Sequence, residues 1–98
     1  MNPSMTYGQP LSGQSVTVAY TGTAGTTTAM PPGTKAVRVI STTDCFIEVT
    51  NNAGVTAVAN TGLYLPALTP EYFICGVNAK VSAVQVSAGG SLYVTPFV

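Results

Sequence analysis

The side chains that could do chemistry in this 98-residue chain are few and widely spaced. There is no histidine, and the acidic residues are Asp44, Glu48 and Glu71. Acid–base catalysis usually needs a group that titrates near neutral pH, or two carboxyl groups within several ångströms of each other. Asp44 and Glu48 lie four residues apart on an expected strand, about 13 Å at roughly 3.3 Å per residue. We interpret them as a turn-initiating and a solvent-facing residue, and Glu71 as a charge that protects a strand edge. The sequence therefore predicts neither an enzyme nor a small-molecule substrate.

The two cysteines, Cys45 and Cys75, lie inside apolar runs typical of strands. We expect buried thiols, because free cysteine usually behaves as a small hydrophobic residue, and a disulfide is the alternative. A nucleophilic thiolate needs a neighbouring cation or base, and Arg38 could approach Cys45 across a hairpin. There is no CxxC motif and no histidine, so no metal site is predicted. The Gly- and Thr-rich stretch 21–28 lacks the lysine of a phosphate-binding loop, so no cofactor is predicted either.

Charged residues make up only 6% of the chain, and the formal net charge is zero. Nucleic-acid binding needs a basic surface that neutralises phosphates, and docking on an anionic membrane needs clusters of lysine and arginine. No apolar stretch approaches the roughly 18 residues of a membrane-spanning helix. The first residues also lack the basic and apolar regions of a secretory signal. We therefore expect neither nucleic acid nor a membrane as a partner.

Apolar and polar residues alternate with a period of two, and no segment has the 3.6-residue period of a helix. A tight turn is expected at 41–44, a hairpin turn at 51–54 (Asn-Asn-Ala-Gly), and a loop or ragged edge strand within 21–34. Strands are predicted at residues 14–20, 35–41, 44–50, 55–59, 63–65, 71–75, 80–87 and 91–97. About eight short strands separated by turn signals indicate a single all-β domain, an antiparallel β-sandwich or jelly roll.

Four aromatic residues lie in or beside the expected strands: Tyr64, Tyr72, Phe73 and Tyr93. No basic residues are interleaved with them, which excludes a stacking platform for single-stranded nucleic acid. We interpret these residues as core-filling, with the tyrosine hydroxyls at the rim of the core. A carbohydrate-binding surface would need an exposed aromatic ring beside an amide or carboxyl group, and Tyr64 with Asn60 is the plausible pair.

Residues 1–13 show no periodicity and are predicted to form an extended arm, while residues 14–98 form the β-sandwich domain. The candidate interface residues of the arm are Met5, Tyr7, Pro10 and Leu11. A domain with so few charges has little to protect its strand edges from pairing with other chains. The composition therefore predicts a homo-oligomer in which the arm pairs with a neighbour or lies over it.

Two longer segments resemble small virion proteins of tailed bacteriophages. Residues 35–49 (KAVRVISTTDCFIEV) are similar to a strand pair with the pattern K-x-V-R-V-x-S-T-T-D-C. Residues 63–95 are similar to a Y/F-L-P-A-x-x-P-E-Y-F segment followed by a V-x-A-I/V-Q-V-S-A-x-G-x-L-Y-V-T ending. The resemblance extends from Lys35 to Thr95 and does not include the arm or the Thr-rich connection.

This resemblance implies a structural protein of a phage particle, of the capsid decoration or cement type. Such proteins are commonly β-sandwiches or jelly rolls that oligomerise on the capsid exterior and staple neighbouring major capsid subunits. The implied partners are the major capsid protein and further copies of the chain. The implied location is the virion, assembled in the bacterial host cytoplasm, where both cysteines are expected as thiols. A tail, head–tail accessory or head-fibre protein is an alternative, as is a carbohydrate-binding β-sandwich for host adhesion.

Overall fold

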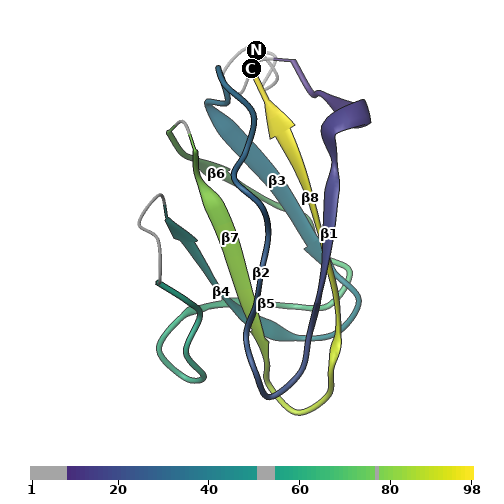
Figure 1. Ribbon diagram of the computed structural model, residues 1–98. Helices are drawn as coiled ribbons and strands as arrows, with labels where there is room; N and C mark the ends of the chain where they lie inside the picture. The colour runs from purple at the N-terminus through teal and green to yellow at the C-terminus, as the bar shows by residue number, and fades with distance from the viewer. Residues whose placement is uncertain (1–8, 51–54, 77) are drawn as a thin grey trace.

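The computed structural model of the protein describes residues 9–50, 55–76 and 78–98. These residues form two four-stranded antiparallel sheets that pack face to face (Figure 1). Sheet A has the order β1 (Val16–Tyr20), β8 (Gly90–Phe97), β3 (Ala36–Ser41) and β6 (Glu71–Ile74). Sheet B has the order β2 (Gly25–Thr26), β7 (Lys80–Gln85), β4 (Cys45–Thr50) and β5 (Leu63–Leu65). A short 3-10 turn, Ser12–Gln14, precedes β1.

The strand pairing is that of a jelly roll. β1 pairs with β8, β2 with β7, β3 with β6 and β4 with β5, as in one long hairpin that has been rolled up. The further pairs β3–β8 and β4–β7 join the rolled strands into the two sheets. Eight strands connected in this way form the double Greek key of a jelly roll. The prediction of an all-β sandwich or jelly roll is confirmed, and the strand order is that of the jelly roll.

The core lies between the sheets and is built largely from alternate residues of the strands, although β7 is buried at four consecutive positions. Six of the side chains with no exposed surface come from three of the four central strands, β3, β4 and β8: Val37, Val39, Cys45, Ile47, Leu92 and Val94. β-Branched side chains are favoured in such strands because they pack well on a pleated surface and lose χ1 freedom in helices. The period-two pattern therefore identifies the buried face of these strands correctly.

The predicted hairpin between β3 and β4 is wrong. β3 belongs to sheet A and β4 to sheet B, so residues 42–44 carry the chain from one sheet to the other. Arg38 is half-buried between two core residues of β3 and so lies on the outer face of sheet A, whereas Cys45 is fully buried between the sheets. Arg38 therefore cannot approach Cys45 across a hairpin, because the two residues lie on different sheets.

The predicted strand at 55–59 is also absent. Ala57 is instead buried against β7, where its backbone N–H donates to Oγ of Ser82 (2.9 Å). Thr26 Oγ1 donates to the same Ser82 oxygen (3.2 Å). The eighth strand is β2, within the connection expected to be a loop or ragged edge strand. The hairpin turn predicted at 51–54 lies outside the described residues.

Candidate interaction surface

Residues 9–11 of the predicted arm pair with the end of β8 in their own domain. Gln9 and Val98 exchange two backbone hydrogen bonds, with N···O distances of 2.9 and 3.0 Å. The N–H of Leu11 donates to the carbonyl oxygen of Pro96 (2.9 Å). Residues 9–11 are therefore held against the end of sheet A.

The four candidate interface residues of the arm divide into two pairs. Pro10 is exposed opposite the end of β8, and Leu11 is half-buried. Met5 and Tyr7 lie outside the described residues. The assignment of these four residues to an interface stays a prediction.

Large apolar side chains are exposed mainly along β5, β6 and the loop between them. Five of them lie on these two strands and their loop, which we together call the β5–β6 edge: Leu63, Tyr64, Leu68, Tyr72 and Ile74. β5 is the last strand of sheet B and β6 the last strand of sheet A. Tyr64 lies on the outer face of sheet B and Tyr72 on that of sheet A, so the edge presents apolar groups on two sides of the sandwich. Exposed large apolar groups at the edge of a domain mark sites that bind other macromolecules. The β5–β6 edge is therefore the candidate interaction surface of the domain.

The interpretation of the tyrosines as core-filling residues is wrong. Tyr64, Tyr72 and Tyr93 are 53%, 41% and 47% exposed, whereas Phe73 packs against the core. Tyr93 is flanked in β8 by two buried residues, so the alternation of the strand places its ring on the outer face of sheet A. The sequence pattern already contains this signal, because the tyrosine stands out of phase with the apolar positions.

Asp44 fixes the loop that joins β5 to β6. Its Oδ1 accepts a hydrogen bond from the backbone N–H of Ala67 (2.8 Å), and its Oδ2 accepts one from the Tyr64 hydroxyl (2.7 Å). These bonds, that of Ala67 first, hold the pKa of Asp44 below its ordinary value. The Tyr64 ring also packs edge-on against Phe46, with centroids 5.7 Å apart. Asp44 thus orients one residue of the β5–β6 edge and anchors the loop that carries another.

The Asp44 contact should make the β5–β6 loop sensitive to acid. A lowered pKa means that the contribution of Asp44 to stability is present above its unfolded-state pKa, near 3.9, and is lost as pH falls through the lower folded-state value. We expect the NMR shift of the Ala67 amide to titrate below about pH 4. The substitution Asp44→Asn should remove this titration. An Ala67 shift that titrates identically in both proteins would contradict the assignment.

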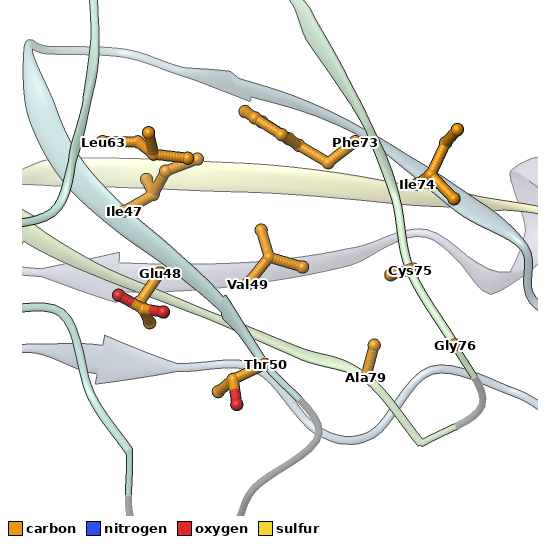
Figure 2. Close-up of a pocket in the computed structure, with 10 residues that line it drawn as sticks. All are labelled: Ile47, Glu48, Val49, Thr50, Leu63, Phe73, Ile74, Cys75, Gly76 and Ala79. Carbon is orange, nitrogen blue, oxygen red and sulfur yellow. The ribbon is translucent and has the colours of Figure 1, made fainter.

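A cavity of about 450 Å³ opens between the two sheets beside the β5–β6 edge (Figure 2). Its apolar lining comes from both sheets and the chain after β6: Ile47, Val49, Leu63, Phe73, Cys75 and Ala79. In Figure 2, Phe73 and Val49 point into the space between β4 and β6, while Ile74 lies on the other side of β6. The cavity therefore separates the two edge strands from each other.

On the side of the sandwich formed by β1 and β2, the two sheets are in close contact. Gly25 of β2 lies so close to β1 that a Cβ atom there would overlap the carbonyl oxygen of Ala19. On the β5–β6 side, by contrast, Leu63 is 54% exposed and lines the cavity. Among the described residues, the sheets thus meet along β1 and β2 and stay apart along β5 and β6.

Cys45 and Cys75 are both free thiols. Cys45 is fully buried in the core, as expected, and Cys75 is half-buried in the wall of the cavity. Burial raises the pKa of both thiols, which disfavours the nucleophilic thiolate. In the part of the chain that the structure describes, no group of three or more histidine, cysteine and acidic residues could hold a metal ion.

Tyr64 and Asn60, the pair considered for carbohydrate binding, do not line the cavity. Tyr64 lies on the outer face of sheet B, across from Phe46, with its hydroxyl bonded to Asp44. Asn60 occupies an exposed turn before β5 with a φ of 69°.

No family model matches the chain, and no curated protein or solved structure does. No helix in residues 9–50, 55–76 and 78–98 is long and apolar enough to cross a membrane. The function is therefore inferred from the sequence and from the surface of the domain.

Proposed function

We propose that the chain is a structural protein of a phage particle, a decoration protein that binds the capsid exterior and staples neighbouring major capsid subunits. The observation that carries the proposal is the β5–β6 edge, an exposed apolar surface on a domain with only 6% charged residues and no net charge. The phage-like segment 63–95 supports it, because this segment contains all five residues of that edge. A partner surface that covers the edge would remove its apolar groups from water.

The physical role of such a protein is to bury surface between subunits. Each contact contributes about 25 cal/mol for every Å² of apolar surface removed from water. Repetition around a symmetric shell makes weak individual contacts effective through multivalency. A tail, head–tail accessory or head-fibre protein would use the same edge on a different partner. The carbohydrate-binding alternative has less support, because the hydroxyl of Tyr64 is bonded to Asp44 and the cavity lacks both residues of the expected pair.

Mass spectrometry and cryo-electron microscopy of purified virions test this proposal. We expect the chain at regular positions on the capsid exterior. Its absence from virions rejects the proposal, and its presence only in the tail or at the head–tail junction favours the alternative structural role.

A matched pair of variants tests which surface binds. Leu68 is 71% exposed in the β5–β6 loop with a φ of 59°, a conformation that asparagine tolerates. We expect Leu68→Asn to weaken binding to capsids that lack the chain by about tenfold, the loss of roughly one buried leucine contact. The control is Val86→Thr, at a position 43% exposed and outside the edge. Equal binding of the two variants would show that the edge does not face the capsid.

A further inference from the structure

We propose that the cavity between the two sheets is a binding site for a small, uncharged molecule made mainly of hydrocarbon. This inference goes beyond the proposed function and does not depend on it, because it concerns the space inside the sandwich and not a partner on its surface. Three observations carry it: the apolar side chains that face the cavity, the strand ladders that hold its walls, and the lack of charge on the described side chains that face it.

The side chains that face the cavity come from both sheets and are apolar: Ile47, Val49, Leu63, Phe73, Cys75 and Ala79. Figure 2 shows Val49 and Phe73 pointing into the space between β4 and β6. Val49, Phe73 and Cys75 pack against the core and yet are only half-buried. A hydrocarbon ligand would remove the remaining apolar surface of these residues from water, which is favourable.

The walls of the cavity are held by strand ladders, so the space is present before a ligand binds. β4 pairs with β7 over its whole length, from Cys45 to Thr50. β6 pairs with β3, and just after β6 the N–H of Cys75 donates to the carbonyl oxygen of Lys35 (2.9 Å). Pre-formed cavities of roughly 300–1,000 Å³ are typical of small-molecule sites. The volume here, about 450 Å³, lies within this range.

The lining selects a ligand without charge. Glu48 is the only charged residue among the described residues that border the cavity. Cys45 and Ile47 of the same strand are fully buried, so the alternation of β4 places Glu48 on the outer face of sheet B. Figure 2 accordingly shows Glu48 on the opposite side of β4 from Val49. A charged group taken into the cavity would therefore lose its water without gaining a partner.

The same lining is unfavourable for ordered water. A buried water typically makes about three hydrogen bonds to polar groups, and apolar cavities stay dry and take up apolar molecules. None of the six side chains that face the cavity carries an oxygen or nitrogen atom. The lining runs from Ile47, which is fully buried, to Leu63, which is 54% exposed, so the space is open to a ligand from solution.

Nuclear Overhauser effects on the wild-type chain test where a ligand binds. The probe is decanol, which has a hydrocarbon chain and no charge. We expect contacts between the chain protons of decanol and the methyl groups of Ile47, Val49 and Leu63. The control is Val86, which is 43% exposed and follows the opposite end of β7 from Ala79. Its methyl groups should show no contact with decanol.

The thiol of Cys75 reports whether the cavity is occupied. Cys75 is half-buried in the cavity wall, whereas Cys45 is fully buried, so a small alkylating reagent reaches Cys75 first in the folded chain. We expect decanol at its solubility limit to slow the alkylation of Cys75 by iodoacetamide about fivefold or more. Decanoate at the same concentration has a chain of the same length but carries a charge, and should change the rate by less than about twofold.

A matched pair of variants tests the need for the space itself. Val49→Phe fills the cavity from a half-buried strand position, and Val86→Phe makes the same exchange outside it. We expect the decanol concentration that half-protects Cys75 to rise about tenfold in Val49→Phe and to stay at the wild-type value in Val86→Phe. If Val49→Phe fails to fold, Leu63→Trp replaces it, because Leu63 lines the cavity at an exposed position that accepts a larger side chain.

Four results would overturn the inference. They are no contact between decanol and the three methyl-bearing residues, contacts confined to exposed residues such as Leu68, equal protection of Cys75 by decanol and decanoate, and wild-type binding by the filled variant. A chain that binds decanol in the cavity but is absent from virions overturns only the proposed function. A chain found on virions whose cavity excludes decanol overturns only the inference.

Discussion

The variant Gly25→Ala will unfold at a much lower urea concentration than the wild type, with a loss of about 3 kcal/mol in the free energy of unfolding. The added Cβ would overlap the carbonyl oxygen of Ala19 and lie 3.0 Å from Cγ2 of Val18. The overlapped atom belongs to the backbone of β1, which is paired with β8 through Ala19 and Ser91. A side chain could rotate away, but relief here requires β1 or β2 to move, which opens the closed side of the sandwich.

The control for this prediction is Gly76→Ala. A Cβ atom at Gly76 would meet nothing within 4 Å. We expect its free energy of unfolding to stay within about 0.5 kcal/mol of the wild-type value, as for most exposed substitutions. Urea unfolding followed by circular dichroism measures both variants. Losses of the same size at the two positions would show that the approach of β2 to β1 is not needed for stability.

The importance of Gly25 could not be predicted from the sequence. Its neighbours are glycine, threonine and alanine, a composition that indicates a loop or a ragged edge strand. β2 is only two residues long and pairs with Ala83 and Ser82, more than fifty positions away. The reason for a glycine at this place is a contact between β1 and β2 across the sandwich, and local patterns do not record such contacts.

The alternation of apolar and polar residues predicts well which face of a strand is buried. It predicts poorly which other strands that strand pairs with. It correctly assigns Val37 and Val39 to the core, and it contains the signal that places Tyr93 outside. It cannot tell a hairpin from a crossing between sheets, because a short polar connection such as 42–44 suits both. The β5–β6 edge could not be predicted for the same reason. Leu63 has the apolar character of a core residue, and it is exposed because β5 is the last strand of its sheet.

Contacts made by side chains with residues far along the chain are the second feature that the sequence does not predict. Asp44 is recognisable as a turn residue, yet its partners Tyr64 and Ala67 lie 20 and 23 residues further along the chain. Residues 55–57 alternate as a strand would, but the N–H of Ala57 binds the side chain of Ser82 instead of a ladder. The backbone N–H groups of a short alternating run can thus donate to side chains or to a neighbouring strand. The sequence alone does not distinguish these two outcomes.

The variant Tyr20→Phe should lose about 2 kcal/mol in the free energy of unfolding, although it changes a single oxygen atom. Tyr20 is 2% exposed at the end of β1. Its hydroxyl donates to the carbonyl oxygen of Thr43 (2.8 Å) and accepts from the N–H of Thr43 (3.3 Å). Thr43 Oγ1 lies 2.8 Å from this hydroxyl and donates to the carbonyl oxygen of Ala88 (3.1 Å). The hydroxyl therefore joins β1 to the crossing between β3 and β4 and to the turn between β7 and β8.

The loss at Tyr20 is expected to exceed that of an ordinary hydrogen bond, because the backbone N–H and C=O of Thr43 would lose a partner in a partly buried place. The matched control is Tyr93→Phe, the same exchange at a tyrosine that is 47% exposed. We expect its midpoint of urea unfolding to change little, since Tyr93 lies partly exposed on the outer face of sheet A. Hydrogen exchange at the Thr43 amide adds a local measurement and should become faster in Tyr20→Phe only. An unchanged Thr43 amide would mean that the three chain segments are held together by packing around Tyr20 and not by its hydroxyl.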